Sequence, residues 1–108
     1  MNNIMLVGRL VETPQINYDE SDKKYTRITL AVNRTFKNAK GIYETDFIPC
    51  MLYGSVAENT CEYCRKGDIM GVKGRLETRF NEETDNKYLI VIAERVSFLS
   101  ASKQESEE

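Results

Sequence analysis

The 108-residue chain contains no histidine and no tryptophan, and only three cysteines and two prolines. The lack of histidine removes the commonest general base and the commonest metal ligand, which argues against an enzyme and against a metal or cofactor site. The odd number of cysteines argues against the disulfide framework of a secreted protein. No apolar run approaches the ~20 residues that span a bilayer, and the opening residues, MNNIMLVGRL, do not resemble a signal peptide. We therefore expect a cytoplasmic protein without catalytic activity.

The charges are distributed unevenly along the chain. The formal net charge is −2, and the last eight residues, ASKQESEE, carry all of it with one lysine and three glutamates. Elsewhere, basic residues gather in two segments, Thr29 to Tyr43 and Arg65 to Phe80. The basic residues of these segments are Arg34, Lys37, Lys40, Arg65, Lys66, Lys73, Arg75 and Arg79. Because local patches attract a polyanion more than the total charge repels it, a nucleic-acid partner is compatible with this composition.

Hydrophobic periodicity predicts five strands and one helix. The strands are expected at residues 3–12, 25–36, 44–54, 68–80 and 86–99, and the helix at 55–67. Ser55 and Glu58 have the spacing of a capping box, and Gly67 stands where a left-handed helix cap is favoured. Three strands, one helix and two strands is the order of the OB-fold, an all-β, five-stranded Greek-key barrel with one helix between strands 3 and 4. A small open β-sandwich is the alternative.

The expected domain covers residues 1–99, followed by a short acidic tail, 100–108, that we expect to be disordered. Three glycines inside the predicted strands, Gly8, Gly71 and Gly74, would permit the sharp coiling that closes a small barrel. Residues 89–93, LIVIA, are apolar on both faces of their strand. That strand is therefore expected to lie centrally in the sheet or at a subunit contact.

Residues 44–54, ETDFIPCMLYG, separate into two faces when read with a period of two. The aliphatic face carries Ile48, Cys50 and Leu52 and suits a core. The opposite face carries Phe47 and Tyr53, about 20 Å apart at roughly 3.3 Å per residue. Because the aliphatic face already supplies the core, these two rings are expected to lie on the outer face, where they can bind a ligand.

Two further aromatic residues end predicted strands beside basic residues: Phe36 lies between Arg34 and Lys37, and Phe80 follows Arg79. Aromatic rings interleaved with basic residues on strand faces are what single-stranded nucleic acid requires. Bases stack on rings at ~1–3 kcal/mol each without sequence preference, while lysine and arginine contact the phosphates. The pattern predicts a platform for a single strand.

Cys61 and Cys64 have the spacing of a redox pair or of half a zinc site. A redox pair favours the start of a helix, whereas these residues lie near the end of the predicted one. A structural zinc needs four ligands, and the chain offers three cysteines and no histidine. We interpret both cysteines as small apolar residues on a buried helical face.

The sequence resembles the bacterial single-stranded DNA-binding protein family over nearly all of residues 1–99. The stretches that carry the resemblance, in the family's order and spacing, are IMLVGRLVETPQINY, ITLAVNRTF, ETDFIPCMLYG, AENTCEYCRKGD and GVKGRLETR. The resemblance implies an OB-fold, assembly as a homotetramer, and binding of single-stranded DNA without sequence preference during replication, recombination or repair.

The resemblance also assigns roles by position. The stacking aromatics fall on Phe36, Phe47, Tyr53 and, at or near it, Phe80. The phosphate contacts fall on Lys66 and Arg79, and the same basic patches extend to Arg34, Lys37, Lys73 and Arg75. Several of the aromatic positions are tryptophan in the best-known members, so stacking is expected to be weaker here. Pro49 stands where relatives often place a polar or basic residue, and it indicates a bulge or an edge position.

The C-terminus departs from the family pattern, and alternatives to the main hypothesis follow from that. The usual Gly/Pro/Gln-rich linker and acidic tip with a final apolar residue do not appear, so recruitment of repair and replication proteins is not implied. A primosomal-type OB-fold adaptor, dimeric and with weak DNA affinity, is the first alternative. RNA binding is another, because every base has a π-face and no motif here reports a 2′-hydroxyl contact.

Overall fold

The structure, a computed structural model, describes residues 1–100, and the predicted tail from residue 101 onward lies outside them. The elements are β1 (Ile4–Leu10), β2 (Asn17–Tyr18), β3 (Lys24–Lys37), β4 (Tyr43–Tyr53), α1 (Gly54–Tyr63), β5 (Ile69–Asn81) and β6 (Asn86–Ser100). The five predicted strands and the helix are all present. The two-residue strand β2, which pairs with the start of β3, was not predicted.

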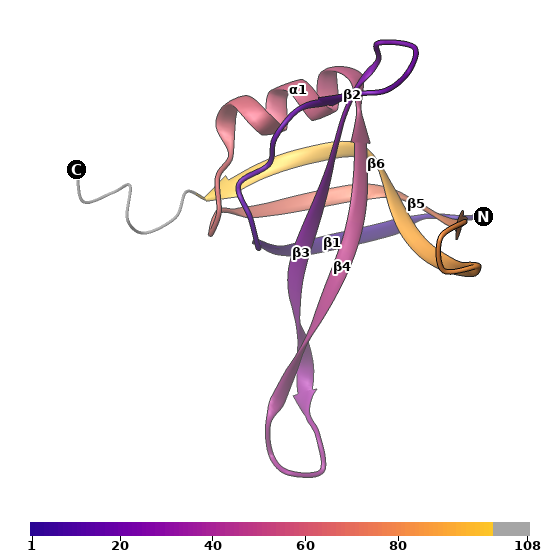
Figure 1. Ribbon diagram of the computed structural model, residues 1–108. Coiled ribbons are helices and arrows are strands. Elements are labelled where there is room, and N and C mark those ends of the chain that lie inside the picture. Colours follow the sequence, from indigo (N-terminus) through magenta and orange to yellow (C-terminus); the bar gives the residue numbers. More distant parts are fainter. Residues whose placement is uncertain (101–108) are drawn as a thin grey trace.

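The strands form one sheet in the order β1-β5-β6-β4-β3-β2, and β1 also pairs with β3 (Figure 1). This closing contact joins Arg9 to Ala31 and Leu10 to Leu30. Five strands therefore close into a barrel, with β2 added at the edge of β3, and the predicted OB-fold is confirmed. The ribbon also shows the β3–β4 hairpin extending well beyond the barrel, at the end away from α1 (Figure 1).

Apolar side chains that alternate with polar ones along the strands point inward and fill the barrel. The buried cluster takes its members from every long strand and from the helix, and includes Leu10, Ile28, Leu30, Cys50, Leu52, Ala57, Met70, Val72 and Val91. The β6 strand lies between β5 and β4, and four consecutive side chains, 90–93, are buried. The central position expected for LIVIA is confirmed for these four residues, whereas Leu89 is exposed.

Helix α1 follows β4 without a loop. The N-cap is Tyr53, in extended conformation and without a side-chain cap bond, and Gly54 takes a φ of +61°. The capping-box prediction is therefore wrong, and Glu58 instead forms an ion pair with Lys24 of β3. The helix also ends earlier than expected, with Cys64 as its C-cap. Gly67 does take a positive φ of +96°, but in the following turn, where its N–H donates to the Leu10 carbonyl.

Two glycines are required where strands approach closely. A Cβ on Gly74 would lie 2.0 Å from the Ile92 carbonyl oxygen, and a Cβ on Gly8 would lie 2.8 Å from that of Ala31. Gly74 also stands at a register shift between β5 and β6. The predicted role in coiling is supported for these two positions, while a Cβ on Gly71 would meet only ordinary contacts at 3.7 Å and beyond.

Candidate nucleic-acid interface

The outer face of β3 and β4 carries the two rings that the alternation of residues 44–54 separates from the core. Phe47 is 64% exposed and Tyr53 39% exposed. They stand opposite Ala31 and Tyr25 in the β3–β4 register. Because directly opposed residues share a face, this outer surface is continuous across both strands. Pro49 lies on it outside the short β4–β6 ladder, which joins only Cys50 and Met51 to β6. This agrees with the edge position expected for Pro49.

An arginine network adjoins Tyr53. The Arg79 guanidinium donates from Nη1 to the Tyr53 hydroxyl at 3.1 Å, and from Nε and Nη2 to Oε1 of Glu77 at 3.1 and 2.9 Å. The second oxygen of Glu77 accepts from Arg75 at 2.7 Å, and Arg75 also donates to Glu94 at 3.0 Å. Hydrogen bonds from Arg79 and then Arg75 hold the pKa of Glu77 below its ordinary value. One carboxylate thus joins two of the predicted phosphate-binding arginines.

The β3–β4 hairpin carries a second group. Arg34 donates to both oxygens of Asp46, at 3.0 and 2.8 Å, and to Glu44 at 2.7 Å. The hydrogen bond from Arg34 lowers the pKa of Asp46. Phe36 is exposed, and the Lys37 ammonium lies 5.7 Å from the centre of the Tyr43 ring. The hairpin therefore presents exposed rings and cations away from the barrel.

The remaining predicted site residues are dispersed. Phe80 is exposed near the end of β5, next to Arg79. Lys66 lies in the turn after α1, where its backbone N–H donates to the Thr13 hydroxyl. Lys73 stands opposite Met5 of β1 and faces a hollow of about 380 Å³ that is lined mainly by apolar side chains. The structure thus brings Tyr53, Arg75 and Arg79 into one hydrogen-bonded network, to which Lys66 and Lys73 make no bond among residues 1–100.

Two residues that the sequence analysis did not assign to the site lie on the same outer surface. The Arg27 guanidinium is 5.7 Å from the centre of the Tyr88 ring, a cation–π contact between β3 and β6. Arg27 stands opposite Met51, and Tyr88 opposite Arg79. The alternation of inward and outward side chains along β3 places Arg27 on this face. That alternation could have identified Arg27 from the sequence. The proximity of Tyr88 depends on the pairing of β4 with both β3 and β6 and could not be read from the sequence.

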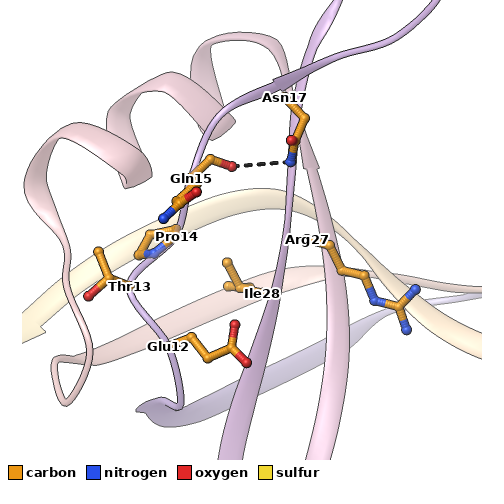
Figure 2. A pocket seen from close by; sticks show the side chains of 7 residues that line it. All are labelled: Glu12, Thr13, Pro14, Gln15, Asn17, Arg27 and Ile28. Atoms are coloured by element: carbon orange, nitrogen blue, oxygen red, sulfur yellow. Dashed lines mark hydrogen bonds between the residues drawn. The ribbon is translucent and has the colours of Figure 1, made fainter.

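A hollow of about 210 Å³ lies beside β3 and is lined by seven residues, Glu12, Thr13, Pro14, Gln15, Asn17, Arg27 and Ile28 (Figure 2). Figure 2 shows the Arg27 side chain pointing away from the Thr13–Gln15 segment. Asn17 donates to the Gln15 carbonyl at 3.3 Å, which ties the segment to β2. The Arg27 side chain therefore lies between this hollow and the Tyr88 ring that it contacts.

The three cysteines are free thiols that lie fully or partly inside the protein. Cys50 and Cys64 are buried and Cys61 is half-buried, all three as free thiols. Burial raises the pKa of Cys50 to about 12 and that of Cys64 to about 11, and it also raises the pKa of Cys61. A redox pair needs the opposite shift, so the apolar interpretation is favoured. Residues 1–100 contain neither a metal-binding cluster of histidine, cysteine or acidic side chains nor a helix able to cross a membrane.

Comparison with known proteins gives a consistent result. Residues 1–99 match the model of the Single-strand binding protein family. The chain is 45% identical to Single-stranded DNA-binding protein B of Bacillus subtilis, covering 96% of this chain and 95% of that one. It is 43% identical to Single-stranded DNA-binding protein 2 of Listeria innocua, covering 92% of this chain and 64% of that one. A Plasmodium falciparum SSB complex with ssDNA superimposes with a TM-score of 0.80 at 25% identity, covering 93% and 96% of the two chains. The chain belongs to the single-strand binding protein family.

Proposed function

We propose that the protein binds single-stranded DNA without sequence preference and protects it during replication, recombination or repair. The observation that carries this proposal is the exposed position of Phe47 and Tyr53 on one outer face, with Arg79 bonded to the Tyr53 hydroxyl. Bases stack on such rings irrespective of sequence, and neighbouring cations contact the phosphates. No bond in the DNA is made or broken, so the function requires no catalytic residue.

The four proposed stacking residues are Phe36, Phe47, Tyr53 and Phe80, and all four are exposed. They run from the hairpin over β4 to the end of β5. A strand that follows these residues passes the cations of the hairpin first and those of β5 last. This path supports a binding surface that holds the strand extended.

The proposed phosphate contacts are Arg34, Lys37, Lys66, Lys73, Arg75 and Arg79. The three arginines are held by carboxylates in ion pairs of 2.7–3.0 Å, whose side chains keep 30–48% of their surface exposed. An exposed ion pair contributes only ~0–1 kcal/mol, so a phosphate can replace the carboxylate. Lys66, in the turn after α1, and Lys73, beside the hollow next to β1, are proposed as contacts for the flanking strand.

The names of the relatives, which describe single-stranded DNA binding, favour this function over the adaptor role. We further propose a homotetramer, with a dimer as the smaller assembly. Its support is an apolar surface on β1 and β6, where Met5, Val7 and Leu99 are exposed beside one hollow. Such contiguous apolar surfaces mark protein contacts. We propose that the protein is located in the cytoplasm with the nucleoid, where the DNA that it binds lies.

The test is a titration of labelled poly-dT by fluorescence anisotropy at two salt concentrations, with duplex of equal length as competitor. We expect tight binding that weakens with salt and that duplex does not displace. Weak binding, or equal competition by duplex, would overturn the proposal. A poly-U oligonucleotide in the same titration separates DNA from RNA preference.

A further inference from the structure

Arg27 and Tyr88 make a contact that the proposed stacking and phosphate residues do not include. The guanidinium lies 5.7 Å from the ring centre, near the outer limit of about 6 Å for a cation–π contact. Arg27 is exposed and Tyr88 half-buried. The ring is thus partly covered by the cation, and both side chains keep surface available to a ligand.

Both side chains also line one hollow of about 270 Å³ on the outer surface. Pro49 of β4 and the amide side chains Asn81 and Asn86 contribute to its walls. The lining therefore combines an aromatic ring, a flat apolar ring, a cation and amide groups that donate and accept hydrogen bonds. This is a suitable chemical environment for a nucleobase with its phosphate.

Arg27 differs from the arginines already assigned to phosphate binding. Arg34, Arg75 and Arg79 are each paired with at least one carboxylate. Within residues 1–100, the Arg27 guanidinium makes a cation–π contact with the Tyr88 ring. It forms no ion pair and no hydrogen bond with the residues of this range. A phosphate at Arg27 would not have to displace a carboxylate first.

The position of this pair is continuous with the proposed path of the strand. Arg27 is opposite Met51 in the β3–β4 register, so Pro49 and Tyr53 are its diagonal neighbours, about 7–8 Å away. Tyr88 is opposite Arg79, which bonds to Tyr53. The hollow therefore lies beside the stretch between Tyr53 and Phe47, which are about 20 Å apart at roughly 3.3 Å per residue.

We propose that Arg27 and Tyr88 form an additional nucleotide subsite of the DNA-binding surface, an inference that rests on the proposed function. A base enters the hollow and packs against the Tyr88 ring and Pro49. The adjoining phosphate contacts the Arg27 guanidinium. The subsite holds the strand between Phe47 and Tyr53, a stretch for which the four proposed stacking residues supply no ring.

The test compares Arg27→Gln and Tyr88→Leu with the wild-type protein in poly-dT titrations over a range of salt. For Arg27→Gln we expect a weaker salt dependence. The negative slope of log K against log salt should become shallower by about 0.7, the value for one phosphate of a single strand. For Tyr88→Leu we expect a loss of affinity of at least about fivefold, largely restored in Tyr88→Phe. Matched controls are Lys23→Gln and Tyr18→Leu, which alter exposed residues around the β2–β3 turn.

The outcomes separate the two proposals. If wild-type protein fails to bind poly-dT, the proposed function itself fails. If wild-type protein binds and both variants match it in affinity and salt slope, the subsite is overturned while the function stands. Circular dichroism checks the fold of each variant. Should Tyr88→Leu unfold because its ring is half-buried, the salt slope of Arg27→Gln decides alone, since that side chain is exposed.

Discussion

Arg79 of β5 donates a hydrogen bond of 3.1 Å to the hydroxyl of Tyr53 on β4, across the intervening strand β6. The same guanidinium is held on its other edge by Glu77 at 2.9 Å. The orientation of an exposed ring is thus coupled to an ion-pair network on another strand. Binding of a base at Tyr53 and of a phosphate at Arg79 should therefore be linked.

We expect Tyr53→Ala to weaken poly-dT binding by roughly 5- to 150-fold, because one stacked base contributes ~1–3 kcal/mol. Tyr53→Phe keeps the ring but removes the bond from Arg79, so its loss should be smaller. Phe47→Ala should resemble Tyr53→Ala. Anisotropy titrations measure the affinities, and thermal unfolding checks that the domain remains folded. Unfolding of both alanine variants would instead identify these rings as structural.

We expect Glu77→Gln to strengthen DNA binding and to steepen its salt dependence. The carboxylate competes with phosphate for Arg75 and Arg79, and its removal leaves both arginines without this partner. Acidification is a poor substitute for the variant, because the pKa of Glu77 is lowered and the charge persists below its ordinary value of 4.5. Glu20→Gln, an exposed glutamate before β3, is the matched control for charge. Weaker binding of Glu77→Gln would show that Glu77 orients the arginines rather than competing for them.

The lowered pKa of Glu77 also predicts how the free energy of unfolding changes with pH. The ion pairs of Glu77 stabilise the folded state at pH values above 4.5, the ordinary pKa, and this contribution is lost as the pH falls through the lower folded value. Wild-type protein should therefore lose stability relative to Glu77→Gln on acidification from pH 5 to 3. Urea unfolding at several pH values measures the difference. Parallel curves for the two proteins would contradict it.

Period-two alternation was sufficient to predict the five long strands and the outward position of Phe47 and Tyr53 on β4, whereas the barrel was predicted from the order of strands and helix. A strand with one buried face has only one register that keeps Cys50 and Leu52 inside, and this places Phe47 and Tyr53 outside. The predicted capping box failed because the helix begins at Gly54, with Tyr53 as its N-cap, so Ser55 lies inside the helix; Glu58 pairs instead with Lys24, which is distant in the sequence. Local spacing could not report that contact.

The hydrogen bonds and ion pairs of the site were harder to predict from the sequence than the faces on which its residues lie, because many of them join different strands. Arg75, Glu77 and Arg79 alternate on one strand, so their proximity was visible in the sequence. The bonds from Arg79 to Tyr53 and from Arg75 to Glu94 join different strands. The Arg27–Tyr88 contact likewise requires β4 to pair with both β3 and β6, which brings these two strands close together. Sequence patterns therefore predicted which faces are exposed but not which cations are already paired.

Two glycines of β5 offer a matched test of the close approach between β5 and β6. Gly74→Ala should destabilise the protein by about 3 kcal/mol or more, or prevent folding, because its Cβ would lie 2.0 Å from the Ile92 carbonyl oxygen. Gly71→Ala should be neutral or slightly stabilising, since the nearest atom to its Cβ would be 3.7 Å away. Urea denaturation measures both free energies of unfolding. Equal stability of the two variants would contradict the close approach at Gly74.

The buried thiols predict a loss of stability in alkaline solution. Burial raises the pKa of Cys50 to about 12, whereas the ordinary value is 9.0. The thiol's contribution is complete below pH 9 and is lost as the pH rises toward 12, because the unfolded chain ionises first. The free energy of unfolding should fall by up to about 1.4 kcal/mol per pH unit from this group.

Comparison with Cys50→Ala isolates this thiol from the tyrosines and lysines that titrate in the same range. The variant should be less stable at pH 7, because it leaves a cavity, and its stability should decline less steeply between pH 9 and 11. Cys61→Ala, at a half-buried position, is the control. Thiol labelling at pH 8 gives an independent reading: Cys50 and Cys64 should react only on unfolding, and Cys61 first among the three. Rapid labelling of Cys50 in folded protein would contradict its burial in the barrel.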